Sequence, residues 1–256
     1  MAPRHPAMLY GLIGHPLMHS YSMDYFNQKF DTEGISAEYI NFDLDDINQL
    51  MEVVSERPNL NGLNVTTPYK EAVIPFLASL DEHAQAIGAV NVIKFLRDKK
   101  TGELEHLRGY NSDAPAFEQT MRPLMTPSLA RALVLGTGGA AQAVTYALPN
   151  RGVAVQQVSR RKSATTLIYE ELTKAIITSH KIIVNATPVG KYPNVNECPD
   201  IPYRFVGSGH LCYDLIYNPD ETMFMKQCKK RGATVKNGLE MLLLQAFLSY
   251  EIWNAD

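Results

Sequence analysis

The sequence predicts an α/β protein with two domains, and three observations lead to that prediction. Short apolar runs rich in β-branched residues alternate with helical patterns along most of the 256 residues, as expected for helices packed on largely parallel sheets. One such run, residues 132–135, leads directly into a glycine-rich turn and then a helical pattern. The proline-containing stretch 123–127 precedes that run and has the composition of a linker.

The first part of the chain predicts alternating strands and helices. A helix begins near Ser22 and is closed by Gly34. Apolar residues with helical spacing predict a second helix over 44–54. A charged, glycine-containing turn at 99–102 predicts a hairpin. The expected strands are 9–13, 37–42, 62–66, 89–96 and 105–110.

The character of the sequence changes near Asp113, where we place the domain boundary. A helix over 113–121 precedes the linker, and a last helix over 239–253 carries two apolar stripes. A helix that is apolar on two sides is expected to be buried between layers, with Gln245 buried and hydrogen-bonded to backbone or ligand. The expected strands are 132–135, 153–158, 181–184 and 211–216.

Composition excludes several classes of function. A net charge of −3 and an isoelectric point near 6.2 give no basic excess for a nucleic-acid partner. No apolar run reaches the roughly 18 residues of a membrane span, so we expect no membrane partner and a cytoplasmic location. Cys198, Cys212 and Cys228 are widely spaced, and no metal site is expected. His15 and His19 are interpreted as loop or structural histidines.

The glycine-rich turn has the dinucleotide-binding spacing Gly136-x-Gly138-x-x-Ala141. The first glycine permits the tight turn, the second lets the backbone approach a pyrophosphate, and the helix N-terminus offers free N–H groups. Gly139 and Ala140 lie inside the same turn. Glycine turns also form for steric reasons alone, but here a strand, a turn, a helix and a second strand follow one another. The pattern therefore predicts a dinucleotide site.

The second strand of that site ends in Ser159-Arg160-Arg161-Lys162, where an NAD site would place an acidic residue. Guanidinium groups suit a 2′-phosphate through bidentate, charge-assisted bonds, so NADP is favoured over NAD. The alternative is a solvated basic turn. Asn185 and Thr187 follow a later strand at the same predicted sheet edge, although they could equally well only cap a turn.

A series of motifs between residues 11 and 246 occurs in an order shared with a known family. They are Gly14-His-Pro-Leu-Met-His-Ser20-Tyr-Ser22, Asn64-Val-Thr-Thr-Pro-Tyr-Lys70, Gly88-Ala-Val-Asn91, Asn111-Ser-Asp113, the glycine turn, Asn185-Ala-Thr187, and Gly238 to Gln245. On these motifs the chain resembles shikimate dehydrogenase. Several motifs in one order are far more specific than any one alone.

The resemblance implies roles for individual residues. Lys70 and Asp113 would be the catalytic pair, which agrees with the chemistry, because hydride transfer to a ketone leaves alkoxide charge that needs a cation or proton donor. Ser20 and Ser22 would bind the substrate carboxylate, with Tyr217 nearby. Ring hydroxyls would be held by Asn64, Thr66, Asn91, Asp113 and Gln245. The cofactor would be held by Gly136, Gly138, Gly139, Ala140, Ser159, Arg160, Arg161, Asn185, Thr187 and Gly238.

Each of these residues also has a purely structural interpretation. Ser22 is a good N-cap for the helix that follows, Lys70 could be a surface lysine, and Asp113 could cap its helix. For any one residue taken alone, the structural interpretation is stronger than the functional one. The polar residues Asn64 and Thr66 at the end of an apolar strand, counted with the other motifs, favour a site.

The chain departs from the family pattern at several positions. Met23 replaces a usual proline, Ser112 a threonine, Thr137 an alanine and Ser159 an asparagine. Only residues 161–180 separate the basic turn from the next strand, where the family commonly has helix, strand and helix. The shortening predicts a smaller cofactor domain that could lack a strand.

The resemblance implies a small-molecule enzyme that reduces 3-dehydroshikimate reversibly to shikimate with NADPH, in the pathway to aromatic amino acids. The domains would be a substrate-binding catalytic domain over 1–112, a Rossmann-like, doubly wound NADP-binding domain over 113–237, and a C-terminal helix over 238–256 that returns to the first. The protein would be a monomer or a homodimer. The alternatives are a quinate/shikimate dehydrogenase and a non-catalytic ligand-sensing protein on the same fold.

Overall fold

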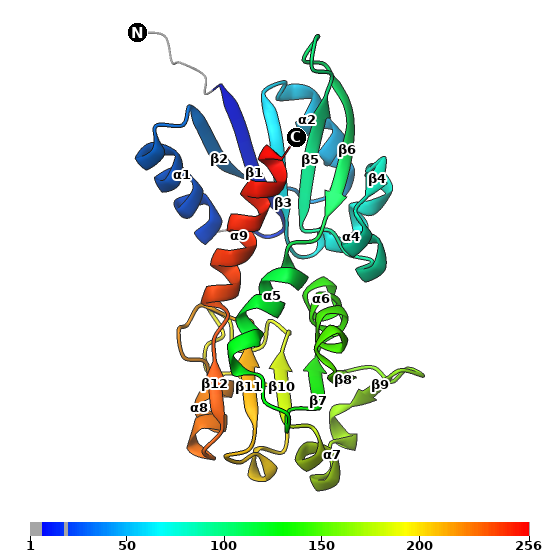
Figure 1. Cartoon of the computed structure of the whole chain (residues 1–256), viewed down its shortest axis with the longest axis vertical. Coiled ribbons are helices and arrows are strands. Elements are labelled where there is room, and N and C mark those ends of the chain that lie inside the picture. Colours follow the sequence, from blue (N-terminus) through cyan, green and yellow to red (C-terminus); the bar gives the residue numbers. More distant parts are fainter. Residues whose placement is uncertain (1–6, 18–19, 256) are drawn as a thin grey trace. The chain divides into compact units, whose positions relative to one another are not determined.

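A computed structural model describes residues 7–17 and 20–255 of the chain (Figure 1). The chain forms two compact units, one made of Met1–Ser112 with Ala246–Asp256 and the other of Asp113–Gln245. Each unit contains a six-stranded sheet. The α/β fold class predicted from the alternating pattern is confirmed.

The sheet of the first unit has the order β2-β1-β3-β5-β6-β4. β1 is parallel to β2 and β3, whereas β5 is antiparallel to β3 and β6. The carboxyl ends of β1, β3 and β6 therefore share one edge with the amino end of β5. The strands are β1 (Met8–Gly14), β2 (Ala37–Asp43), β3 (Leu60–Val65), β4 (Ser79–Leu80), β5 (Val92–Arg97) and β6 (Leu104–Tyr110).

Both faces of this sheet are buried, which explains the uninterrupted apolar run in β1. Leu9 and Ile13 belong to one core cluster, and Tyr10 and Leu12 belong to another, as the alternation of a strand requires. The helices of this unit are α1 (Tyr21–Glu33), α2 (Leu50–Glu56), α3 (Tyr69–Ala72) and α4 (Glu82–Ile87), with 3₁₀ turns η1 (Ile47–Gln49) and η2 (Ile74–Phe76).

The helix predicted over 44–54 begins later than expected. Asp46 is extended and accepts a hydrogen bond from the Asn48 N–H at 2.9 Å, so it caps η1 and ends the preceding segment. Leu44 is buried in the core but lies before the helix. The apolar spacing was correct for burial, whereas an acidic cap decided where the helix begins.

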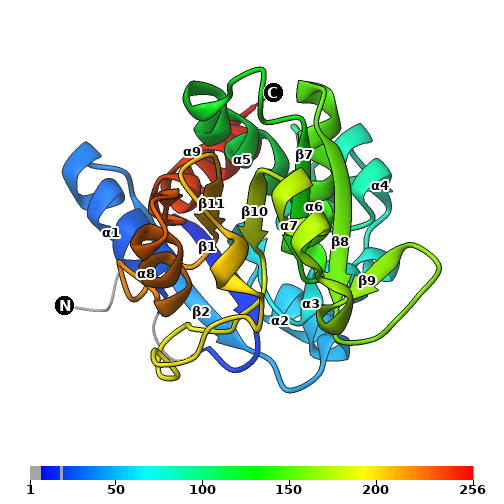
Figure 2. The same ribbon diagram turned by 90° about the horizontal axis from the view of Figure 1, so that it is seen from below.

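The sheet of the second unit has the order β12-β11-β10-β7-β8-β9, and its strand pairs are parallel. Figure 2 shows β10, β7 and β8 side by side. The chain runs from β7 to β8 and β9 on one side and then crosses to β10 on the other, which makes β7 the topological switch point. The strands are β7 (Arg131–Leu135), β8 (Ala154–Ser159), β9 (Thr166–Ile168), β10 (Ile182–Asn185), β11 (Leu211–Asp214) and β12 (Thr234–Lys236).

Helices and 3₁₀ turns precede or connect these parallel strands. The helices are α5 (Asp113–Met121), α6 (Gly139–Ala147), α7 (Lys174–Ser179) and α8 (Met223–Lys230). The 3₁₀ turns are η3 (Arg122–Leu124), η4 (Leu148–Arg151), η5 (Tyr169–Glu171) and η6 (Tyr203–Phe205). The doubly wound architecture predicted for this part of the chain is confirmed.

The expectation that the shortened segment 161–180 could cost a strand is wrong. β9 is present and pairs with β8 from Gln157↔Thr166 to Ser159↔Ile168. What this segment lacks is a helix between β8 and β9, where the chain instead makes a turn. In that turn the Ser163 N–H donates to Thr166 Oγ1 at 3.1 Å. The sheet keeps its order because a short hydrogen-bonded turn replaces the helix.

The last helix, α9 (Leu239–Asn254), belongs to the first unit from Ala246 onward. Trp253 is buried there, and its indole N–H donates to Ile93 O at 3.1 Å. A Cβ on Gly62 would lie 2.4 Å from the indole, so only glycine fits beneath it. The helix was expected to be buried between layers through two apolar stripes, but Phe247 of one stripe is 48% exposed, so that stripe is only partly covered.

Candidate functional site

Three asparagines lie at the shared edge of the first sheet, and all three are buried. Asn64 is near the end of β3, Asn91 directly precedes β5, and Asn111 follows β6. The antiparallel pairing Asn64↔Val92 places the first two beside each other, and Val92↔Tyr110 places the third on the other side of β5. Asn64 and Asn91, which were singled out separately in the sequence, therefore lie next to each other at one sheet edge, with Asn111 across β5.

These amides are bonded to neighbouring groups in definite orientations. The Asn64 amide donates to Asn91 O at 3.2 Å and to Ser249 Oγ at 2.9 Å. Ser112 orients Asn91, because its N–H donates to Asn91 Oδ1 at 2.7 Å and its hydroxyl accepts from Asn91 Nδ2 at 2.9 Å. The Asn111 amide donates to Ala89 O at 2.8 Å. Asn91 is therefore pre-oriented before any ligand binds.

The two candidate carboxylate-binding serines flank the start of α1. Ser20 is the N-cap and accepts from the Met23 N–H at 3.4 Å, so the cap is Ser20, and the alternative that assigned it to Ser22 is wrong. Both serines are buried. Met23 supplies a donor that the proline usual in the family lacks. A hydroxyl that accepts this bond keeps its own hydrogen for an anion. Met18 and His19 of this motif lie outside the described residues.

Thr66 and Lys70 lie on the turn between β3 and α3. The Thr66 N–H donates to Ile13 O, and Thr66 O accepts from the Tyr69 N–H, each at 2.9 Å. The Tyr69 hydroxyl donates to Leu44 O, and the Val90 N–H donates to Lys70 O at 2.7 Å. Backbone bonds thus hold Lys70 beside the segment that carries Asn91, with its side chain partly buried.

His15 is held by an acidic partner that sequence reasoning missed. Its Nδ1 lies 2.8 Å from Asp43 Oδ1 at the ends of β1 and β2. The hydrogen bond from His15 is the main reason why the pKa of Asp43 lies below its usual value. The interpretation of His15 as a structural histidine agrees with this pair, which the parallel register Gly14↔Asp43 brings together.

In the second unit, the glycine turn lies at the carboxyl end of β7. Gly136 has φ +113, a conformation that L-residues rarely adopt, and its N–H donates to Val158 O at 2.8 Å. A Cβ on Gly138 would meet nothing within 4 Å, so the space before the N-terminus of α6 is open. Gly139 and Ala140 form the first turn of that helix. A phosphate can approach these backbone N–H groups.

The basic turn after β8 presents two exposed arginines, Arg160 and Arg161. The hydroxyl of Ser159 accepts from the Arg161 N–H at 3.2 Å, and Lys162 is paired with Glu171. In the part of the chain that the structure describes, neither arginine has a carboxylate within salt-bridge distance. Arg160 and Arg161 are therefore the cations of this turn that are available to an anionic ligand.

Asn185 and Thr187 order the turn after β10. Asn185 Oδ1 accepts from both the N–H of Thr187 at 3.1 Å and its hydroxyl at 2.6 Å. The Asn185 amide donates to Asp214 Oδ1 at 3.0 Å. The turn-capping interpretation is therefore correct for these two residues. Turn capping is compatible with a cofactor role. The capping bonds fix this loop next to the glycine turn, where Ala186 O would lie 3.2 Å from a Cβ on Gly136.

Asp214, at the end of β11, was missed by sequence reasoning although an acid at the end of an apolar strand is an unusual signal. Its carboxylate also accepts from the Ile216 N–H at 3.1 Å and the Thr222 hydroxyl at 2.6 Å. Burial raises its pKa to about 6 despite these three hydrogen bonds. The loop that leads to Tyr217 is thus tied to the loop of Asn185 through one carboxyl group.

Tyr217 and Gly238 lie beyond β11 on neighbouring segments. Tyr217 is partly buried, and burial raises the pKa of its phenol. The Gly238 N–H donates to Ile216 O at 3.0 Å, and a Cβ there would lie 2.0 Å from Leu215 O, so only glycine fits.

Gln245 is only partly buried, contrary to expectation, although its amide does donate to backbone, at Leu242 O, 3.1 Å away. Asp113 is buried as the first residue of α5.

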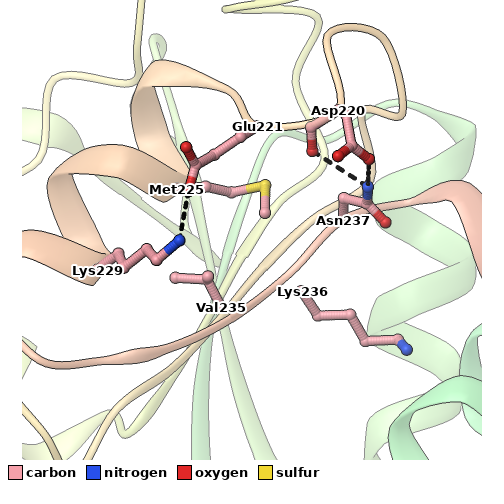
Figure 3. Close-up of a pocket in the computed structure, with 7 residues that line it drawn as sticks. All are labelled: Asp220, Glu221, Met225, Lys229, Val235, Lys236 and Asn237. Atoms are coloured by element: carbon pink, nitrogen blue, oxygen red, sulfur yellow. Dashed lines mark hydrogen bonds and ion pairs between the residues drawn. The ribbon is translucent and has the colours of Figure 1, made fainter.

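A separate hollow of about 550 Å³ lies on the second unit between α8 and β12 (Figure 3). Its charged side chains are occupied with one another, since Lys229 lies 2.9 Å from Glu221 and Asn237 donates to Asp220 at 2.6 Å. Lys236 is paired with Glu240. None of the candidate residues lines this hollow, and the paired charges give it no evident chemistry.

The described residues contain no cluster of histidine, cysteine, aspartate and glutamate side chains suited to a metal ion. Within the same residues no helix has the length and apolar character that crossing a membrane requires.

Comparison with known proteins identifies relatives along nearly the whole chain. Residues 12–93 match the family model described as the shikimate dehydrogenase substrate binding domain. A shikimate dehydrogenase (NADP(+)) of Methanococcus maripaludis is 35% identical over 265 residues, which cover 96% of this chain and 90% of that protein.

Solved structures extend the comparison. A shikimate 5-dehydrogenase from Thermus thermophilus, in complex with NADP(H) and shikimate, is 29% identical with a TM-score of 0.83, covering 97% of this chain and 94% of that one. A quinate dehydrogenase from Corynebacterium glutamicum, in complex with NAD, is 26% identical with a TM-score of 0.82, covering the same shares of the two chains. Both substrates thus occur among proteins of this fold.

Proposed function

The chain belongs to the shikimate dehydrogenase family, and we infer that it catalyses the reversible, NADPH-dependent reduction of 3-dehydroshikimate to shikimate. The observation that carries this inference is 35% identity over 96% of the chain to an NADP-dependent relative of that name. The two sheet edges support it, one lined with amides and hydroxyls suited to a polyhydroxylated acid and the other with an open glycine turn.

We propose Lys70 and Asp113 as the catalytic pair. When bound, NADPH supplies the hydride that reduces the ketone. The carbonyl oxygen then gains negative charge, and the Lys70 ammonium can stabilise it and deliver a proton to it. In the reverse direction the amine accepts the hydroxyl proton. Asp113, buried at the start of α5, would hold a ring hydroxyl.

The substrate carboxylate is assigned to Ser20 and Ser22, with Tyr217 assisting. Ser20 is the better defined of the serines, because the Met23 N–H occupies one of its lone pairs and leaves its hydrogen available. Ring hydroxyls are assigned to Thr66, Asn91, Asp113 and Gln245. Asn64 is assigned the role of supporting Asn91, since the two amide hydrogens of Asn64 already have two acceptors.

The cofactor is assigned to the second unit. Gly136, Gly138, Gly139 and Ala140 would receive the pyrophosphate on backbone N–H groups. Ser159, Arg160 and Arg161 would bind the 2′-phosphate, for which two exposed guanidinium groups are suited. Asn185, Thr187 and Gly238 would shape the loops beside the nicotinamide.

We also propose a role for each part of the chain. Residues 1–112 would be the substrate-binding catalytic domain, 113–237 the NADP-binding domain, and 238–256 the segment returning to the first. The protein is proposed to work in the cytoplasm as a monomer or a homodimer.

The test is a turnover assay with shikimate or quinate, each combined with NADP or NAD, followed by the absorbance of the reduced cofactor. We expect the fastest turnover with shikimate and NADP, and we expect Lys70→Ala to lower kcat by about 10²–10⁴-fold. The exposed Lys99 of the 98–102 turn, changed to alanine, is the matched control. Faster turnover of quinate with NAD would instead assign the chain to the second substrate, and binding without turnover would favour the sensor.

A further inference from the structure

A buried line of hydroxyl and amide groups crosses the first unit from β2 to α9. The Tyr39 hydroxyl donates to Asn64 Oδ1 at 2.9 Å, and the Asn64 amide donates to Ser249 Oγ at 2.9 Å. Tyr39 and Ser249 have no exposed surface, and Asn64 is 4% exposed. Buried polar groups are costly unless bonded, so each member depends on the others.

The line continues from Ser249 to Asn91. The hydroxyl oxygens of Ser249 and Ser112 lie 3.3 Å apart, and Ser112 Oγ accepts from Asn91 Nδ2 at 2.9 Å. Asn64 also contacts Asn91 directly, because its amide donates to Asn91 O, so the bonds form a closed ring. The helix α9, the strand β3 and the segment before β5 are thereby joined through side chains.

The direction of these bonds is fixed at one end. Burial raises the pKa of the Tyr39 phenol well above its ordinary value, so the phenol remains a neutral donor. Its O–H points to Asn64 Oδ1, which forces the Asn64 amide hydrogens toward Ser249 and Asn91. An amide without this donor could rotate by half a turn and present its oxygen to Ser249 instead.

We propose that Ser249 is a positioning residue for the substrate, acting through Asn91 and Gln245. Gln245 precedes Ser249 by one helical turn, so the two side chains lie on the same side of α9. The Ser249 hydroxyl sets the height and rotation of α9 against β3, and with them the place of Gln245. Through Ser112 it also fixes the Asn91 amide.

This assignment rests on the proposed function, in which Asn91 and Gln245 hold ring hydroxyls. Ser112 belongs to the same line of groups, since it and Ser249 have no exposed surface and their hydroxyl oxygens lie 3.3 Å apart.

The experiment compares Ser249→Ala with Thr120→Val in the full chain. Thr120 is equally buried in the second unit, and its hydroxyl bonds to the Tyr213 hydroxyl at 2.8 Å and Phe117 O at 2.9 Å. Both variants therefore lose one buried hydroxyl. The measurements are KM for shikimate, KM for NADP, the Kd of shikimate by calorimetry, and the melting temperature.

For Ser249→Ala we expect KM and Kd for shikimate to rise about tenfold, the size of one lost hydrogen bond, with KM for NADP within about twofold of the wild type. Thr120→Val is expected to lower the melting temperature and leave KM and Kd for shikimate unchanged. Ser112→Ala is expected to raise KM and Kd for shikimate by about as much as Ser249→Ala does. The double Ser112→Ala, Ser249→Ala variant should raise them by less than the product of the two single-variant factors, because both residues act in one network.

If Ser249→Ala does not fold, Tyr39→Phe carries the test, since it removes only the donor at the start of the line and is expected to raise KM for shikimate about threefold. A Ser249→Ala protein that melts at a lower temperature but binds shikimate as the wild type does would overturn the proposal and leave the function intact. A wild-type chain that neither binds nor oxidises shikimate would overturn the proposed function, and the positioning role with it.

Discussion

At the carboxyl edge of the first sheet the candidate residues are mainly buried amides and hydroxyls bonded to one another, whereas at that edge of the second sheet glycine turns and exposed arginines accompany the buried Asn185. Buried Asn91 is held by Ser112, while Arg160 is solvated. Side chains that are fixed by packing can select the shape of a substrate. Backbone N–H groups and surface cations suit phosphates, which need charge more than shape.

The largest expected effect separates two glycines of the second unit. Gly238→Ala would place a Cβ 2.0 Å from Leu215 O, and we expect a loss of about 4 kcal/mol in the free energy of unfolding. Gly138→Ala meets nothing within 4 Å, so stability should stay within about 0.5 kcal/mol while the Kd of NADP rises. Urea unfolding and NADP titration of both variants provide the measurement. Equal stability losses would contradict the distinction between packed and ligand-facing glycines.

The next effect concerns the one buried acid of the second edge described above, Asp214. Its pKa in the folded protein is about 6 against an ordinary 3.8, so the folded state holds the proton more tightly. Stability therefore falls as the pH rises from 3.8 through 6, by up to about 3 kcal/mol, and stays lower above that window. Below 3.8 both states are protonated and the difference is absent.

Asp214→Asn tests this sign. Asparagine keeps an acceptor for Asn185 and Ile216 and a donor for Thr222 without any charge. The stability of the variant relative to the wild type should rise between pH 4 and pH 7, measured by urea unfolding at each pH. A difference that does not change with pH would show that Asp214 titrates normally.

A smaller effect is expected at the exposed cations. Replacing Arg160 and Arg161 together by alanine should raise the Kd of NADP by about 30-fold and that of NAD by less than about twofold, because only NADP carries the 2′-phosphate. The loss should shrink at high salt, since solvated charges are screened. Lys230→Ala, an exposed cation on α8, is the control. Equal losses for the two cofactors would place the 2′-phosphate elsewhere.

The smallest expected effect returns to the first edge. Met23→Pro removes the N–H that Ser20 accepts at 3.4 Å, but the first turn of a helix tolerates proline. We expect KM for shikimate to change by about twofold, with the melting temperature nearly unchanged. A tenfold change would mean that the capping bond, rather than the serine hydroxyl alone, prepares the carboxylate site.

The comparison also shows what the sequence could predict. Local patterns were sufficient for the strand, glycine turn and helix around Gly136, because each signal lies within a few residues. The three-residue strand β9 is too short to show a period. The bond between Asn64 and Ser249 joins residues 185 positions apart, and the residues next to each of them in the sequence do not predict it. Contacts between side chains that are brought together only by the tertiary fold could therefore not be predicted from the sequence.

The return of α9 to the first unit has a consequence for how the protein is made. Trp253 fills a space over Gly62 and packs against Tyr10 and Phe26. A growing chain synthesised only as far as Gln245 contains the whole second unit but leaves that aromatic space empty. The first unit is therefore discontinuous in sequence, and its aromatic core can be completed only after the chain has passed through the whole second unit.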